Sequence, residues 1–196
     1  VDDLKAVFTH AGLGGEAGEY KLLTQSFLYK FLNDKFLYEA QNVDSENTYE
    51  HLVSMSEEDY DWLLEDIGTS TAWMKPNQFI ETLHRKQNES DFYETFENTL
   101  NQIAIDNNDI FSVHTDENTT VRLFNERLIT DIIPDSSKRN EVAKSIINLL
   151  ARVKFDEAIF SQGFDFFSTL FEYMIKDYNK DGGGKYAEYY TPHSVA

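Results

Sequence analysis

The sequence lacks cysteine altogether, and it has only three prolines and nine glycines in 196 residues. Without cysteine, the chain can form no disulfide, no thiolate metal site and no cysteine nucleophile. No apolar run approaches the ~18 residues that a membrane-spanning helix needs, and the N-terminus, Val1-Asp2-Asp3, lacks the basic start of a signal peptide. We therefore expect a cytoplasmic protein that has no membrane partner.

Basic residues are also scarce, because 17 Lys and Arg stand against 35 Asp and Glu and leave a formal net charge of −18. An acidic surface repels phosphate and gains nothing from counterion release, which disfavours direct DNA binding by this segment alone. Aromatic residues, by contrast, make up 14% of the chain. Disordered chains are poor in aromatic residues, so we expect this one to fold.

Apolar residues at spacings of three and four predict a mainly α protein. A long helix without Pro or Gly is expected from Glu19 to about Asn42, with its apolar residues on one broad face. These residues form two stripes: Tyr20, Leu23, Phe27 and Phe31, and Leu28, Leu32 and Phe36. Further helices are predicted to start near Ser56, Pro76, Ser90 and Pro134.

A last helical stripe follows Gly163. Its apolar residues are Phe164, Phe167, Leu170, Phe171, Met174, Ile175 and Tyr178. Residues 110–124 instead show a period close to two, which fits a short β-hairpin or an irregular loop. We therefore predict a multi-helix N-terminal domain over residues 1–180, followed by a Gly-rich linker from residue 181.

Two short motifs have the spacing of binding sites. Residues 12–17 match G-x-G-x-x-A, but a dinucleotide site needs a βαβ unit, so the motif is interpreted as a turn before a helix. Residues Asp177 to Glu188 satisfy the EF-hand pattern D-x-[DN]-x-[DN]-G-x5-E, although Gly184 stands where such loops have an apolar residue and no partner hand occurs. A polar helix end is the first interpretation, and a calcium-binding, EF-hand-like helical interaction protein is the alternative. The five His are scattered, so they predict no metal site.

The end of the chain carries the most specific pattern. Residues 164–175 read FDFFSTLFEYMI, and after a Gly-rich gap residues 185–195 read KYAEYYTPHSV. This junction resembles the methyltransferase subunit of type I restriction-modification systems, in which a D-x-x-G-x-x-Y-E-x-x-x helix leads to G-[EQ]-[FY]-[FY]-T-P-[RH]-x-[VL]. Ala187 and Ser168 replace two glycines of that pattern. Residues 25–35, QSFLYKFLNDK, are similar to an apolar stretch early in the same family.

The resemblance implies a helical N-terminal domain followed by an α/β domain that uses S-adenosyl-L-methionine to methylate the exocyclic amino group of adenine in DNA. By position in the motif, the implied cofactor-binding residues are Glu188, Tyr189, Tyr190, Thr191, Pro192 and His193. The family's acidic, glycine-containing cofactor loop and its N-P-P-[FY] motif do not occur in residues 1–196. No catalytic residue is therefore assigned, and we expect these residues to be an inactive fragment of an enzyme.

The resemblance also implies partners. They are a specificity subunit, a second methyltransferase subunit and a restriction subunit, with double-stranded DNA reached through the assembled complex. Because the specificity subunit reads the DNA in this family, the acidic charge is compatible with the assignment. The helical domain would then serve subunit assembly and closure around DNA through exposed apolar or aromatic patches. Residues 181–196 would be the linker and the start of the truncated methyltransferase domain.

Overall fold

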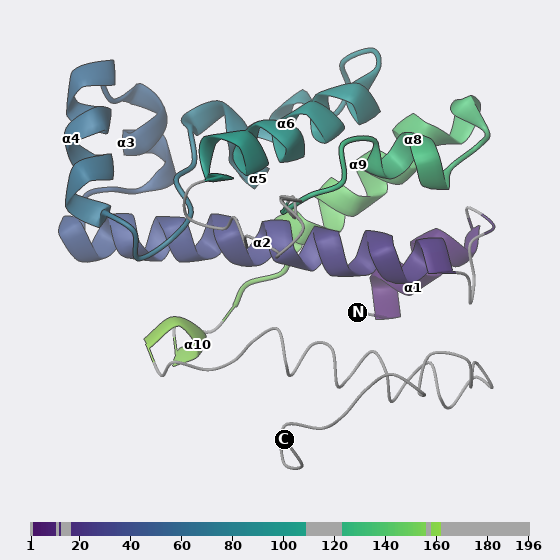
Figure 1. The fold of residues 1–196 in the computed structure, drawn as a ribbon, viewed down its shortest axis with the longest axis horizontal. Coiled ribbons are helices and arrows are strands. Elements are labelled where there is room, and N and C mark those ends of the chain that lie inside the picture. Colours follow the sequence, from purple (N-terminus) through teal and green to yellow (C-terminus); the bar gives the residue numbers. More distant parts are fainter. Residues whose placement is uncertain (1, 11, 13–16, 109–122, 156–157, 162–196) are drawn as a thin grey trace, which may run out of the picture.

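Helices make up the regular structure of this chain. The computed structural model describes residues 2–10, 12, 17–108, 123–155 and 158–161, and within these ranges it contains no strand (Figure 1). The elements are α1 (Asp2–His10), α2 (Ala17–Val43), α3 (Tyr49–Ser54), α4 (Glu57–Ile67), the 3-10 turn η1 (Pro76–Gln78), α5 (Ile80–Lys86), α6 (Phe92–Asp106), α8 (Leu128–Ile132), α9 (Ser136–Arg152) and α10 (Ala158–Ser161). The predicted mainly α fold is confirmed.

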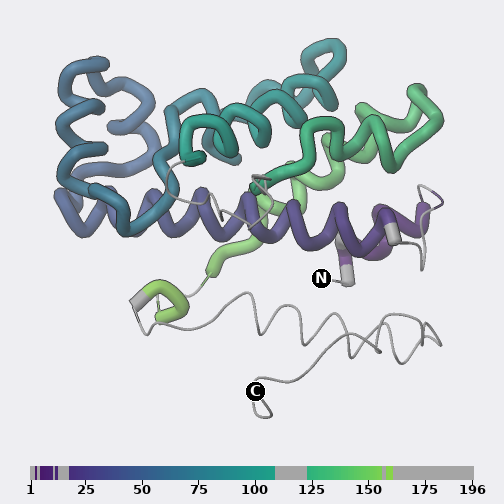
Figure 2. The backbone as a smooth tube through the Cα atoms, in the orientation of Figure 1, coloured from purple at the N-terminus to yellow at the C-terminus, as the bar shows by residue number. Residues whose placement is uncertain are grey.

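α2 is the central helix of the fold, and it runs along the length of the molecule with other helices laid against it (Figure 1 and Figure 2). It contacts α1, α4, α8 and α9. Every residue from Gly18 to Ala40 is buried or partly buried. Phe27 and Phe36 are nine residues apart, which puts them on opposite sides of the helix, yet they are only 5% and 0% exposed. The prediction of one broad apolar face was therefore wrong, because α2 is enclosed on all sides.

Two predicted helix starts are confirmed by side chains that cap their own helix. Ser56 Oγ accepts a hydrogen bond from the Asp59 N–H at 3.2 Å and begins α4. The Asp135 carboxylate accepts one from the Ser137 N–H at 3.0 Å and begins α9. Hydrogen bonds from the Ser137 hydroxyl and backbone also lower the pKa of Asp135. Such caps satisfy N–H groups that have no partner within the helix.

The starts of α5, α6 and α8 have no cap of their own and depend on side chains from other helices. The Ile80 N–H donates to Asn33 of α2 at 2.9 Å, the Tyr93 N–H to Asn140 of α9 at 3.0 Å, and the Thr130 N–H to Glu97 of α6 at 2.6 Å. Two of these starts differ from the predicted positions. The N-cap position of α6 is Asp91 rather than the predicted Ser90, but its side chain makes no capping hydrogen bond. Pro76 opens the short turn η1 ahead of α5.

Several predicted elements lie outside the described residues. They are the hairpin or loop near 110–124, of which only residues 123 and 124 are described, the helix over residues 164–178, and the linker from residue 181. The sequence pattern does not predict α1, α3, α8 and α10, because helices of four to nine residues contain fewer than three turns of apolar repeat. Among the described helices, none is both long and apolar enough to cross a membrane.

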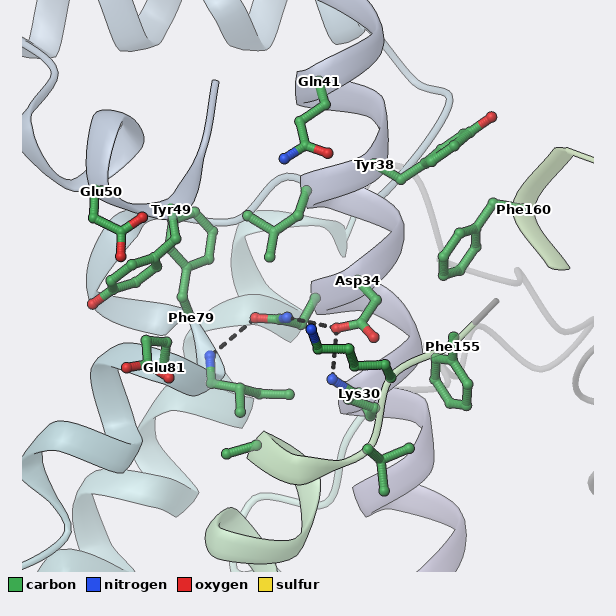
Figure 3. A pocket seen from close by; sticks show the side chains of 16 residues that line it. Lys30, Asp34, Tyr38, Gln41, Tyr49, Glu50, Phe79, Glu81, Phe155 and Phe160 are labelled. Atoms are coloured by element: carbon green, nitrogen blue, oxygen red, sulfur yellow. Dashed lines mark hydrogen bonds and ion pairs between the residues drawn. The ribbon is translucent and has the colours of Figure 1, made fainter. Parts of the chain in front are cut away.

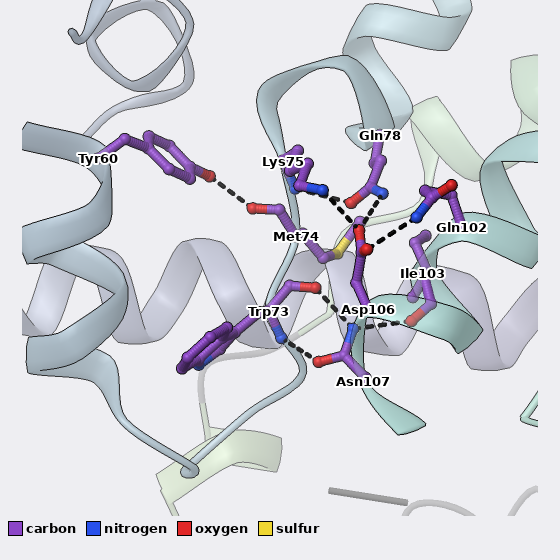
Figure 4. A network of polar contacts seen from close by, with 9 residues as sticks. All are labelled: Tyr60, Trp73, Met74, Lys75, Gln78, Gln102, Ile103, Asp106 and Asn107. Carbon is purple, nitrogen blue, oxygen red and sulfur yellow. Dashed lines mark hydrogen bonds and ion pairs between the residues drawn. The ribbon is translucent and has the colours of Figure 1, made fainter. Parts of the chain in front are cut away.

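A buried amide joins the end of α6 to the loop that precedes η1 (Figure 4). Asn107 is 1% exposed, and its side-chain Oδ1 accepts a hydrogen bond from the Trp73 N–H at 2.6 Å. Its Nδ2 donates to the carbonyl oxygens of Trp73 and Ile103, each at 2.8 Å. One side chain therefore satisfies three backbone groups and holds an irregular loop in place.

Asp106, the last residue of α6, connects the same loop to the helix through its carboxylate (Figure 4). It accepts hydrogen bonds from Gln78 at 3.2 Å and Gln102 at 2.7 Å, and it pairs with Lys75 at 3.0 Å. Partial burial raises the pKa of Asp106, but the hydrogen bonds from Gln102, Lys75 and Gln78 outweigh it, and the net shift is downward. The stabilisation is therefore present at neutral pH and is lost as the pH falls through the folded-state pKa.

The capping pattern predicts that Asn140→Ala destabilises the fold and that Ser90→Ala does not. Asn140→Ala leaves the Tyr93 N–H at the start of α6 without its acceptor, which costs about 1 kcal/mol. Ser90 is exposed, and α6 is not capped by it. Urea unfolding followed by circular dichroism measures both variants, and equal stabilities of the two would contradict the cross-helix cap.

Candidate functional site

The site residues predicted from the motif, Glu188 to His193, lie outside the described residues, as does the calcium-type loop from Asp177 to Glu188. The structure therefore brings none of them together and separates none of them. Of the residues 12–17 motif, Gly12 is described, and its φ of +89° fits the predicted turn before α2. In the described ranges no group of three or more His, Asp or Glu side chains is arranged to hold a metal ion.

A groove of about 500 Å³ lies where the chain leaves α9 and crosses α2 (Figure 3). Its walls come from α2, the starts of α3 and α5, the segment after α9, and α10. The lining residues include Lys30, Asn33, Asp34, Leu37, Tyr38, Gln41, Tyr49, Glu50, Phe79, Ile80, Glu81, Phe155 and Phe160. Since these residues span 130 positions of the chain, only the folded domain forms the groove.

The floor of the groove is a set of paired polar groups on α2 (Figure 3). Asn33 Oδ1 accepts the Ile80 N–H at 2.9 Å, and Asn33 Nδ2 donates to Asp34 Oδ1 at the same distance. Asp34 also pairs with Lys30 one turn earlier at 2.9 Å, and the two side chains are 16% and 7% exposed. Each buried polar group on this floor therefore has a partner, which burial in a low-dielectric interior requires.

An aromatic cluster forms one wall of the groove. Phe160 of α10 packs against Phe31 and Tyr38 of α2, with ring centroids 5.6 and 5.4 Å apart, and Phe155 lies 6.5 Å from it edge-on. The Lys35 ammonium, paired with Glu39, lies over the rings of Tyr38 and Phe160. These ring contacts fasten α10 to α2.

The other wall is built around Tyr49 at the start of α3. Its ring meets Phe79 edge-on at 6.2 Å, and its hydroxyl shares a 3.1 Å hydrogen bond with Thr82. The guanidinium of Arg85 lies 4.8 Å from the centre of the Tyr49 ring. A hydrogen bond with Glu81 at 3.0 Å is the main reason that the pKa of Arg85 is raised.

The lining of the groove combines aromatic rings with paired charges. Its described lining contains no His, Ser or Thr, and the one buried Lys is held in an ion pair. Aromatic walls and paired charges suit the binding of a protein segment.

The acidic end of the molecule offers a second candidate surface. The C-terminal end of α2 lies there together with α3 and α4 (Figure 1). Three large apolar residues in these helices are exposed: Val43 at 44%, Val53 at 45% and Trp62 at 64%. α4 carries six acidic residues and no Lys or Arg. Trp62 lies outside the apolar stripe of α4. A large aromatic residue off that stripe is the sequence signal that could have identified this surface.

Comparisons with known proteins found no relative of this chain. It matches no protein-family model, and neither the curated proteins nor the solved structures gave a match. The functional assignment therefore depends on the residues and the geometry of the chain itself.

The buried ion pair on the groove floor predicts an asymmetric response to mutation. Asp34→Asn leaves the Lys30 ammonium buried without a counter-charge, which should cost about 3 kcal/mol in the free energy of unfolding. Lys30→Met combined with Asp34→Asn removes both charges and should recover most of that loss.

The matched control for this pair is Asp131→Asn in α8. Asp131 pairs with Arg127 at the same i,i+4 spacing, but both side chains are more than half exposed, so the loss should stay below about 0.5 kcal/mol. Urea unfolding of the variants gives all of these values. A double variant less stable than Asp34→Asn alone would overturn the assigned role of the pair.

Proposed function

We propose that this chain is the helical N-terminal domain of a methyltransferase subunit of a type I restriction-modification system. The observation that carries the proposal is the junction at residues 164–195, which combines an amphipathic stripe, a Gly-rich gap and the EYYTPH segment. Its support from the fold is that the residues ahead of this junction form a helical domain, as the resembled family has. The complete subunit would be a DNA adenine methyltransferase.

The chemistry of the motif suits S-adenosyl-L-methionine, which supplies the methyl group in this family. Tyr189 and Tyr190 offer aromatic rings to line a pocket. Thr191 followed by Pro192 has the pattern of a helix start, and a helix start presents free backbone N–H groups to a carboxylate such as that of the cofactor. We propose that Glu188 to His193 contribute these contacts in the complete subunit.

The helical domain itself is proposed to assemble subunits rather than to read DNA. Its net charge of −18 opposes direct contact with phosphate. Trp62 is 64% exposed, in a helix packed beside α2, and it is of the residue type that most often anchors protein interfaces. We therefore assign this end of the domain to contact with the specificity subunit, through which closure around DNA would be achieved.

A substitution in the motif tests the assignment of the cofactor site. In the complete subunit, expressed from the gene that encodes this chain, Tyr190→Ala should weaken S-adenosyl-L-methionine binding at least about tenfold in calorimetry, because a ring that lines the pocket is lost. Tyr186→Ala, just ahead of the motif residues, is the matched control and should bind as the unmodified subunit does. Unchanged affinity in Tyr190→Ala would remove the motif from the cofactor site.

The alternative function rests on the EF-hand pattern between Asp177 and Glu188. Calorimetric titration of residues 1–196 with calcium separates the two proposals. Heat of binding that Asp181→Ala abolishes would favour a calcium-responsive interaction protein, because Asp181 is a ligand position of that loop. No heat of binding would leave the methyltransferase proposal alone.

The subunit-contact surface makes its own prediction. Trp62→Ser in the complete subunit should weaken association with the specificity subunit by about 10- to 30-fold, as loss of a buried interface tryptophan does. Ile105→Ser is the matched control, since Ile105 is 63% exposed but belongs to α6. Analytical ultracentrifugation measures both, and equal association of the two variants would place the contact elsewhere.

A further inference from the structure

The outer face of α4 carries one large aromatic side chain, Trp62, which is 64% exposed. The inner face is formed by Tyr60, Leu63 and Ile67, which are buried. Tyr60 also donates its hydroxyl to the Met74 carbonyl oxygen at 2.7 Å and so fixes how α4 is turned. At about 100° per residue, Trp62 lies on the side of the helix away from these buried residues. Among the described residues, no Lys or Arg side chain lies over its indole ring.

Carboxylates surround Trp62 on this outer face. Glu58 lies four residues before it, and Glu65 and Asp66 lie three and four residues after it, so all three are its neighbours on the helix surface. Each of them is exposed, and none forms an ion pair with a described residue. Because α4 contains no Lys or Arg, these charges are not balanced within the helix.

This arrangement of charges is unfavourable for the helix on its own. Glu65 and Asp66 lie in the last turn of α4, where the helix dipole disfavours negative charge. Asp61 lies four residues after Glu57 and four residues before Glu65, and like charges at this spacing repel each other. A cation bound to the outer face would relieve both effects. The free helix is therefore electrostatically matched to a positively charged partner.

The domain contains an example of a cation held by a ring and neighbouring carboxylates. The guanidinium of Arg85 lies 4.8 Å from the centre of the Tyr49 ring, and it pairs with Glu81 at 3.0 Å and with Glu50 at 3.9 Å. The outer face of α4 offers the same combination of groups, an aromatic ring and carboxylates, but no described residue supplies the cation. Tryptophan is the strongest ring for such contacts, and arginine is the cation most often found on it.

We propose that the outer face of α4 binds an arginine-bearing basic segment of a partner protein, with a guanidinium stacked on Trp62 and paired with Glu58 or Glu65. Charge complementarity selects this occupant, because DNA, an anionic membrane surface and a second copy of this chain, with its net charge of −18, are all repelled. The inference rests on the proposed function for the identity of the partner, which would be the specificity subunit. The chemistry of the face is tested without that subunit.

Titration of residues 1–196 with synthetic peptides tests this chemistry. The probes are an alanine-based helical peptide with arginine at every fourth position, and a matched peptide with lysine at the same positions. NMR resolves two indole N–H signals, from Trp62 and Trp73. The arginine peptide should move the Trp62 signal saturably and the Trp73 signal less, because the Trp73 indole already donates to the Gly68 carbonyl oxygen at 2.6 Å. The lysine peptide should bind more weakly, because an ammonium does not stack on a ring as a guanidinium does.

Substitutions of exposed residues locate the binding. Trp62→Ser should weaken the affinity for the arginine peptide about fivefold. Glu58→Gln combined with Glu65→Gln should also weaken it. The matched control is Glu89→Gln combined with Glu141→Gln, which removes two exposed charges outside α4 and should leave the affinity close to that of the unmodified chain.

Three results would overturn the inference. Equal losses in the two double variants would reduce the binding to attraction by net charge, a stationary Trp62 signal would place it elsewhere, and equal affinity for the two peptides would remove the role of arginine. The proposed function fails separately. If the peptide binds as expected but Trp62→Ser in the complete subunit keeps its affinity for the specificity subunit, the arginine-binding face stands and its assignment to that subunit falls.

Discussion

The need to cover α2 on every side governs the rest of this structure. A helix of 27 residues with aromatic and aliphatic side chains around its whole circumference cannot face water on any side without exposing them. α4, α8 and α9 pack on it, α1 joins near its beginning, and α10 reaches it from the far end of the described chain. The helices that surround α2 are short or strongly amphipathic, so their own stability depends on the surface that α2 provides.

The same enclosure explains the polar residues within α2. A lysine or an asparagine inside a packed helix is costly unless its polar atoms find partners. Asn33 meets this requirement by accepting the first N–H of α5, and Lys30 does so by pairing with Asp34. A buried polar group on the central helix therefore becomes the cap of another helix. The groove floor is a product of this packing, and the polar atoms of Asn33, Lys30 and Asp34 are already paired within it.

The domain has two candidate contact surfaces, the groove on α2 and the end that carries Trp62. One is the groove on α2, whose aromatic wall joins α10 to α2. The other is the end that carries the exposed Trp62. The acidic residues of α4 at this end repel the phosphates of DNA, so the surface is better suited to a protein partner. Such contact surfaces are compatible with the proposed role in subunit assembly.

The sequence by itself determined the elements whose signals are local. The apolar repeat identified α2, and the capping residues Ser56 and Asp135 identified the starts of α4 and α9, because a cap and its N–H are two or three residues apart. The proposed cofactor residues also come from the sequence alone, since the motif at residues 188–193 is contiguous. Tertiary structure alone decided that α2 is enclosed all round, that Asn33 and Asn140 cap helices 47 residues away, and that one groove unites residues 30 to 160. Periodicity and capping depend on neighbours within one turn of helix, whereas these contacts exist only once the helices have packed.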